Sequence, residues 1–342
     1  MAILWWDGFD QYPDDADVRA VPAYSLSSTS IDTHGTAINQ RFGVGRCIDC
    51  NMGSPADSLV FTFPAAIAGC TVGFAYNDLS TAFLASPGSV IMRLRNGGTA
   101  LINLQIDNTG TIHITNAASA ILASSAAGLV GINAWHYYEI EAVRDAAAGQ
   151  VRVWLDGVQV INATGLNTGA VNFDRMIWYT WASNVSLFYD DFYFGNTATD
   201  HLGDSRVDTL YANADTVEKD FSRSAGADNY LLVDEAFWDA DTTYVFSSTV
   251  GHLDLYEFGN LAVTPSQIHG VKVRTVARKD DATVREIRTQ LKSGATTANG
   301  ATFTLGTSYG IKDDYYMTDP NTTAAWTAAA VNALQVGPEI IT

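Results

Sequence analysis

The sequence predicts a mainly β protein, and residues 135–161 give the strongest evidence for it. Apolar side chains recur at every second position from Tyr138 to Ala142 and again from Val151 to Leu155. A period of two residues is typical of a strand with one buried face and one wetter face. Asp156-Gly157 follows, and this pair favours a tight hairpin because both central residues need a positive φ. These residues therefore predict two successive antiparallel hairpins.

Short strand-like runs recur along residues 1–200, separated by turn sequences such as Asn108-Thr-Gly110. Many short strands at regular spacing are typical of a sandwich or jelly roll. Strand-like runs give way to a mostly polar stretch around residues 196–206, and we place the domain boundary there. We therefore expect a jelly roll over residues 1–200 and a second, smaller β-rich domain over residues 201–342.

Two long runs in the second domain predict central strands. They cover residues 271–277 and 284–291, and the four residues 278–281 would join them directly. Both runs are rich in β-branched residues, which favour strands over helices.

One short helix is predicted near the C-terminus. Trp326, Ala330 and Leu334 are spaced four residues apart, which places them on one helix face. Asn321-Thr-Thr323 would cap its start, and Gly337-Pro338 would end it. We expect this helix to pack Trp326 into the core of the second domain.

The charge of the chain argues against two classes of partner. The net charge is −18, with 19 basic and 37 acidic residues. Neither nucleic acid nor an anionic membrane surface would attract such a chain. The sequence has no apolar run long enough to span a membrane, and its start lacks the basic region of a secretion signal. We expect a protein that folds in a cytoplasm.

The three cysteines, Cys47, Cys50 and Cys70, predict free thiols. An odd number with one close pair argues against a disulfide framework. Cys47 and Cys50 form a C-x-x-C motif, but a structural zinc needs four ligands and no second such motif exists. We expect no cofactor and assign no metal ligand, with a structural calcium as the alternative left open.

Glu139 and Glu141 are the best candidates for catalytic residues. Carboxylates at i and i+2 on a strand share one face, as a retaining glycosidase requires. Jelly-roll β-glucanases carry the pattern Glu-x-Asp-x-x-Glu, and here the last acid is replaced by Arg144. An arginine cannot donate the proton that such an enzyme needs. We therefore interpret both acids as part of the solvent face of a strand.

Other polar and aromatic residues suggest no defined chemistry. Adjacent acids on a strand point to opposite faces and do not form a chelate by themselves, so the acidic pairs predict turns and surface charge. Aromatic residues that could stack on sugars are expected to be packed instead. The acids are Asp190, Asp191, Asp239, Asp241, Asp280 and Asp281; the aromatic residues are Tyr137, Trp154, Trp178, Tyr179 and Trp181; and the scattered histidines are His34, His113, His136, His201, His252 and His269.

Several short motifs together resemble a family of tailed-bacteriophage structural proteins. In the first domain they are Trp6-Asp7-Gly8-Phe9-Asp10-x-Tyr12, Arg41-Phe42-Gly43 to Gly45-Arg46, Trp135-x-Tyr137-x-Glu139, Val151-x-Val153-x-x-x-Gly157 and Asp190-Asp191-Phe192-Tyr193. In the second they begin with Leu202-Gly203-Asp204-x-Arg206-Val207 and continue through Tyr230-x-x-Val233-Asp234-Glu235, Gly251-x-x-Asp254-Leu255-Tyr256 and Ala325-Trp326. The match runs nearly end to end.

The resemblance implies a LamG-like, concanavalin A-like jelly roll in residues 1–200 and a virion-assembly domain in residues 201–342. It implies a non-enzymatic virion component, either a tail-associated fibre or adhesion protein or a decoration of the capsid or neck. The implied partners are other virion proteins and copies of the chain itself in a homo-oligomer, with a host surface glycan as a further candidate. The family has no agreed catalytic residues, so no catalytic or cofactor-binding residue is assigned. The alternative is a glycan-binding module or a depolymerase of host surface polysaccharide.

Overall fold

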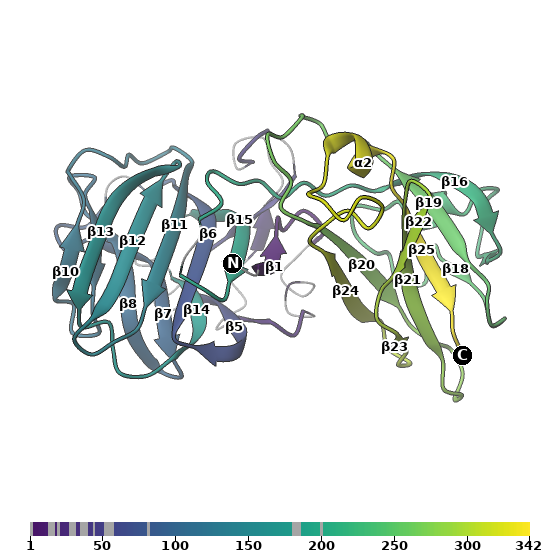
Figure 1. Ribbon diagram of the computed structural model, residues 1–342, viewed down its shortest axis with the longest axis horizontal. Coiled ribbons are helices and arrows are strands. Elements are labelled where there is room, and N and C mark those ends of the chain that lie inside the picture. The colour runs from purple at the N-terminus through teal and green to yellow at the C-terminus, as the bar shows by residue number, and fades with distance from the viewer. Residues whose placement is uncertain are drawn as a thin grey trace. The chain divides into compact units, whose positions relative to one another are not determined.

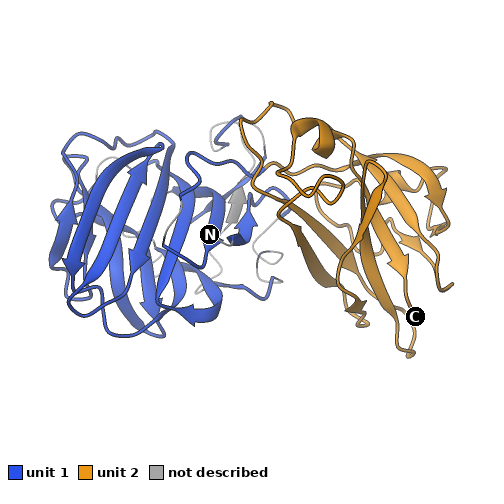
Figure 2. Cartoon of the chain, viewed as in Figure 1, with its two compact units in different colours: residues 1–207 blue, residues 208–342 orange. Residues whose placement is uncertain are grey.

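The computed structural model is mainly β and divides into two compact units, residues 1–207 and 208–342 (Figure 2). It describes residues 3–12, 18, 21–26, 32–34, 40–43, 45–50, 58–80, 83–179, 186–198 and 201–342. The first unit ends at Val207, a few residues beyond the boundary expected from the sequence. Within these described ranges, no helix is long and apolar enough to cross a membrane.

The first unit is a jelly-roll sandwich of two antiparallel sheets, visible as two layers in Figure 1. One sheet has the order β13-β12-β11-β6-β15-β4-β3, with β1 also paired to β15, and the other has the order β10-β9-β8-β7-β14-β5-β2. The strands of the first sheet are β1 (Ile3–Asp7), β3 (Asp32–His34), β4 (Cys47–Asp49), β6 (Gly69–Asp78), β11 (His136–Val143), β12 (Gly149–Leu155), β13 (Val158–Leu166) and β15 (Leu187–Gly195). Those of the second are β2 (Tyr24–Leu26), β5 (Ser58–Ile67), β7 (Ser89–Asn96), β8 (Thr99–Ile106), β9 (Ile112–Thr115), β10 (Ile121–Ser124) and β14 (Phe173–Tyr179).

The two predicted hairpins are confirmed as β11-β12-β13. Asp156 and Gly157 join β12 to β13 with φ values of 51° and 79°, the left-handed conformation that the Asp-Gly pair predicts. Tyr138 and Ile140 point into the core and are fully buried. The opposite face of β11 is buried as well, which the alternation did not predict.

Aromatic side chains fill the space between the two sheets. Trp178 on β14 is fully buried and meets Phe192 on β15 edge to face, with ring centroids 4.7 Å apart. Phe61 on β5 contacts the same Phe192 ring at 4.9 Å. Such edge-to-face pairs add to the free energy gained by burying apolar area. This core fixes the position of β15, which carries Asp190 and Asp191.

The second unit has one larger sheet with the order β16-β19-β25-β21-β22, and β23 also pairs with β21. Two pairs of strands, β17-β18 and β20-β24, lie outside it. The elements are β16 (Ala212–Lys219), β17 (Ser222–Arg223), a short 3-10 helix (Tyr230–Leu232), β18 (Val245–Phe246), β19 (Asp254–Phe258), β20 (Val271–Ala277), β21 (Glu286–Ser293), β22 (Thr296–Asn299), β23 (Phe303–Thr304), β24 (Gly310–Tyr316), α2 (Ala328–Asn332) and β25 (Gln335–Ile340).

The predicted pair of central strands is only half right. β21 is central, but β20 pairs with β24 rather than with β21. Residues 278–281 therefore connect two different sheets and do not form a hairpin. Arg278 and Asp281 each form a side-chain ion pair there, with Asp241 and Arg285 respectively, both at 2.8 Å.

The predicted helix exists but is shorter than expected. α2 begins after Thr327, whose side chain accepts a hydrogen bond from the Ala330 amide, so residues 321–323 are not its cap. Gly337-Pro338 lies inside β25 and does not end the helix. Trp326 precedes α2 and is 3% exposed in a cluster with Leu291 and Val336. The expected burial of Trp326 is confirmed.

Candidate functional site

Glu139 lies on β11, between β6 and β12, and its side chain is completely buried. It pairs across the sheet with Gly73 on β6. A Cβ atom at Gly73 would lie 2.0 Å from the Tyr193 ring, so the glycine leaves the space in which that ring packs. The Tyr193 hydroxyl donates a 2.6 Å hydrogen bond to Glu139 Oε1. The Glu139 carboxyl and the Tyr193 phenol are therefore buried together on one face of the sheet.

The segment that follows the last strand of the sandwich covers Glu139. The Leu202 amide donates to Glu139 Oε1 at 2.6 Å, and the Gly203 amide donates to the same oxygen at 3.0 Å. Burial raises the pKa of Glu139, and the three donors partly oppose this rise. The expectation that Glu139 and Glu141 lie on a solvent face is wrong, because both are buried and residues 202–203 cover Glu139.

Asp191 anchors the same segment a few residues further on. It lies at a β-bulge of β15 with a φ of 50°, where the strand's alternation breaks. The Val207 amide donates to Asp191 Oδ1 at 2.8 Å, and Arg41 Nη1 donates to Asp191 Oδ2 at 2.5 Å. Arg41 also donates to the Ser205 carbonyl at 2.7 Å and pairs with Asp204. We call Arg41, Glu139, Asp191 and Tyr193 the linker-anchoring cluster, and residues 202–207 the linker.

Asp190 is buried beside this cluster and favours its neutral form. Burial raises its pKa well above the ordinary value, and the negative charges of Asp191 and Asp10 add to the rise. The Asp191 amide donates to Asp190 Oδ1 at 2.7 Å. The expectation that this acidic pair contributes surface charge is therefore wrong, since Asp190 and Asp191 are only 7% and 3% exposed.

We expect Asp190→Asn to flatten the pH dependence of stability. Because the folded-state pKa of Asp190 is raised, the folded chain keeps a proton that the unfolded chain loses above about pH 4. The free energy of unfolding should then fall as pH rises through that window towards the folded-state pKa. The amide cannot ionise, so the variant should lose this part of the slope. Urea unfolding between pH 4.5 and 8 measures it, and parallel curves for the two proteins would contradict the assignment.

The other candidate residues form local structural contacts. Glu141, 3% exposed, accepts a 2.9 Å bond from Arg152, and Arg144 donates to the Asn172 side chain. Asp239 accepts hydrogen bonds from Thr243 in a turn, as expected. Tyr137, Trp154 and Trp178 are packed, as predicted, and Trp154 stacks on His201 at 4.3 Å. Trp181 and the Tyr179 side chain lie outside the described residues.

None of the three cysteines forms a disulfide, as expected, and all three are fully buried. Burial raises the pKa of the Cys47 and Cys70 thiols, which suppresses the reactive thiolate. Within the described ranges, no group of three or more His, Cys, Asp and Glu side chains could hold a metal ion.

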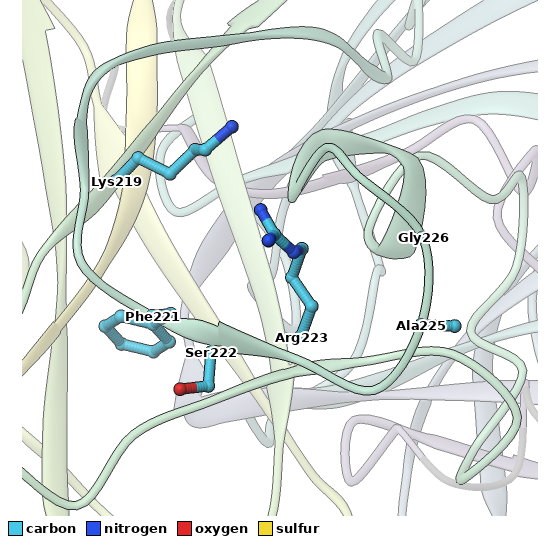
Figure 3. Close-up of a pocket in the computed structure, with 6 residues that line it drawn as sticks. All are labelled: Lys219, Phe221, Ser222, Arg223, Ala225 and Gly226. Atoms are coloured by element: carbon cyan, nitrogen blue, oxygen red, sulfur yellow. The ribbon is translucent and has the colours of Figure 1, made fainter.

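A pocket of about 560 Å³ lies in the second unit (Figure 3). Its lining residues are Lys219, Phe221, Ser222, Arg223, Ala225 and Gly226. Lys219 pairs with Asp215 at 2.6 Å, and Arg223 donates to the Ala227 carbonyl at 2.7 Å. The two cations therefore stabilise the surrounding loop. The residues that line the pocket include neither a pair of acids nor a nucleophile next to a base.

Arg41, Asp191 and Tyr193 lie in sequence motifs that do not show their contacts. Their partners lie far away in the sequence: Arg41 meets Asp191 across 150 positions, and Glu139 meets Leu202 across 63. Apolar residues flank Asp190-Asp191 on both sides, which is typical of a buried strand. A charge inside such a strand needs a partner, so this pattern indicates that the two acids have one.

No family model matches the sequence, and no curated protein matches it either. Among solved structures, a sialidase aligns at 13% identity and a TM-score of 0.39, covering 56% of this chain and 18% of its own. This chain thus spans less than a fifth of the sialidase. A protein of unknown function with a galectin-like fold from Bacillus subtilis aligns at 13% identity and a TM-score of 0.38, covering 57% of this chain and 96% of its own. The metal-free carbohydrate recognition domain of Emp46p aligns at 10% identity and a TM-score of 0.39. The alignment covers 57% of this chain and 99% of that domain.

Proposed function

We propose that this chain is a non-enzymatic structural protein of a bacteriophage virion, working through contacts with other virion proteins and with copies of itself. The main support is that residues from separate sequence motifs all form hydrogen bonds with the linker. Arg41, Glu139 and Asp191 come from three separate motifs, and each accepts or donates a hydrogen bond at residues 202–207. The linker itself is a fourth motif.

These contacts suit a subunit of an assembly. Ordering a mobile linker during assembly costs conformational free energy, and a linker that is already anchored avoids that cost. Buried, hydrogen-bonded carboxylates hold a segment in one place more firmly than surface ion pairs do. We therefore infer that the motif residues serve to fix where the chain leaves its first domain.

The same contacts argue against glycoside hydrolysis at β11. A general acid must reach the oxygen that it protonates. Glu139 is fully buried with both oxygens facing the linker amides, and Glu141 pairs with Arg152. We assign neither acid a catalytic role.

A host surface glycan is the second candidate partner. The concanavalin A-like sandwich favours it, by analogy only, because a fold does not fix a function. Incubating the protein with host capsular polysaccharide or lipopolysaccharide tests both forms of this alternative. Saturable binding would support a lectin-like role, and release of reducing ends would support a depolymerase.

The virion role is tested on phage particles. We expect mass spectra of purified particles to contain the chain in a fixed copy number, and immunogold labelling to place it at one position on the tail, neck or capsid. We also expect the purified chain to form a symmetric oligomer in solution. Absence from intact particles, together with a strictly monomeric protein, would contradict the proposal.

A further inference from the structure

Three polar side chains form a hydrogen-bonded chain at the outer end of the second sheet of the sandwich. Asp107 follows β8, His113 lies on β9, and Ser124 ends the edge strand β10. His113 Nε2 lies 3.0 Å from Asp107 Oδ2, and His113 Nδ1 lies 2.7 Å from the Ser124 hydroxyl. Ser124 and His113 face each other directly across the two strands, so the sheet register sets their separation.

The surroundings of Asp107 keep its carboxyl ionised. Its Oδ1 accepts from the Thr109 amide at 2.8 Å, the Thr109 hydroxyl at 2.6 Å and the Thr111 amide at 3.1 Å. Burial alone would raise the pKa of Asp107, but the hydrogen bonds from His113 and Thr109 outweigh it and lower the pKa below its ordinary value. An ionised carboxylate only accepts hydrogen bonds.

The charge of Asp107 sets the direction of its hydrogen bond with His113, because only a protonated Nε2 can donate to a carboxylate. In the neutral imidazole with its proton on Nε2, the lone pair lies on Nδ1. That tautomer accepts the hydrogen bond of the Ser124 hydroxyl at Nδ1. Asp107 and His113 are 4% and 5% exposed, whereas Ser124 is exposed at the edge of the sheet. A nucleophile next to a base, with the base oriented by a buried acid, is the arrangement that activates a serine.

We propose that Ser124 is an activated nucleophile that accepts the acyl group of a small carboxylic ester, with His113 as its base and Asp107 as the positioning residue. Ser124 Oγ forms a bond to the ester carbonyl carbon while its proton moves to His113 Nδ1. The bond between the carbonyl carbon and the alkoxy oxygen then breaks, and His113 returns the proton to the departing alcohol. The product is an ester at Ser124. The reaction ends with the acylated serine, so the protein need not act as a catalyst. It does not depend on the proposed virion role.

The test treats the full chain with p-nitrophenyl acetate and follows both nitrophenolate release and the acetylated peptide by mass spectrometry. We expect the acetyl group to accumulate at Ser124 to one per chain, with one equivalent of nitrophenolate released. Ser124→Ala should lower the acylation rate at least about 100-fold, the lower end of the contribution of a positioned base. Ser119→Ala removes another exposed serine of the same β9-β10 hairpin and should leave the rate unchanged.

Two further variants separate activation from folding. His113→Gln keeps an amide donor for Asp107 but no base, and it should abolish acylation while the circular dichroism spectrum stays that of a folded β protein. Asp107→Asn should lower the maximal acylation rate without changing the ester concentration at half-maximal rate, as expected of a positioning residue. An unlabelled Ser124 in the wild type, or equal labelling of Ser124→Ala and the wild type, would overturn the proposal.

Discussion

Replacing Arg41 with alanine should destabilise the first unit by about 3–5 kcal/mol, the typical result of leaving one partner of a buried ion pair alone. The Arg41 and Asp191 side chains are 5% and 4% exposed, so little water can replace the guanidinium. The variant also removes the hydrogen bond to the Ser205 carbonyl and the contact with the Tyr137 ring, whose centroid lies 4.8 Å from the guanidinium carbon. Hydrogen exchange of β11 and β15 peptides in increasing urea measures the first unit separately from the second.

Two controls show whether burial causes this loss. Arg175→Ala breaks an ion pair whose side chains are 34% and 26% exposed, and it should cost no more than about 1 kcal/mol. Adding Asp191→Asn to Arg41→Ala removes the stranded charge and should recover part of the stability. Equal effects of Arg41→Ala and Arg175→Ala would mean that the linker-anchoring cluster contributes little.

Glu139→Ala should cost about 3 kcal/mol, because it leaves buried donors without an acceptor. Those donors are the Tyr193 hydroxyl and the amides of Leu202 and Gly203. Glu139→Gln keeps the Oε1 acceptor that all three share, and it should stay within about 1 kcal/mol of the wild type. The same urea and hydrogen-exchange measurement compares the two variants.

The glutamine variant also distinguishes a structural acid from a catalytic one. If Glu139 only anchors the linker, Glu139→Gln should behave like the wild type in every assay with host glycans. A glycan-cleaving activity of the wild type that disappears in a stable Glu139→Gln protein would make Glu139 catalytic.

The sequence predicted the fold best where contacts are local. β11, β12 and β13 pair with their chain neighbours, so alternation and the Asp156-Gly157 turn were enough to identify them. The same alternation failed for Glu139, because a strand pattern cannot show that residues 202–203 cover its polar face. The pairing of β20 with β24 was missed for a related reason, since about thirty residues separate the two strands.

Helix α2 and the pair Asp190-Asp191 are two further features that the local sequence pattern did not predict correctly. The spacing of Trp326 and Leu334 reflects burial in one cluster, but only five residues between them are helical. Asp190 and Asp191 were assigned to the surface as charged residues, yet a β-bulge and Arg41 allow both to be buried. Neither a bulge nor a partner 150 positions away leaves a local signal.

Buried carboxylates of the first unit hold the linker in place. Native-state hydrogen exchange of the Leu202, Gly203 and Val207 amides tests it most directly, because each donates to one of these carboxylates and none lies in a strand. We expect slow exchange at all three in the wild type, and fast exchange at Leu202 and Gly203 in Glu139→Ala while β11 stays protected. Exchange at the rate of an open loop in the wild type would mean that the carboxylates do not hold the linker.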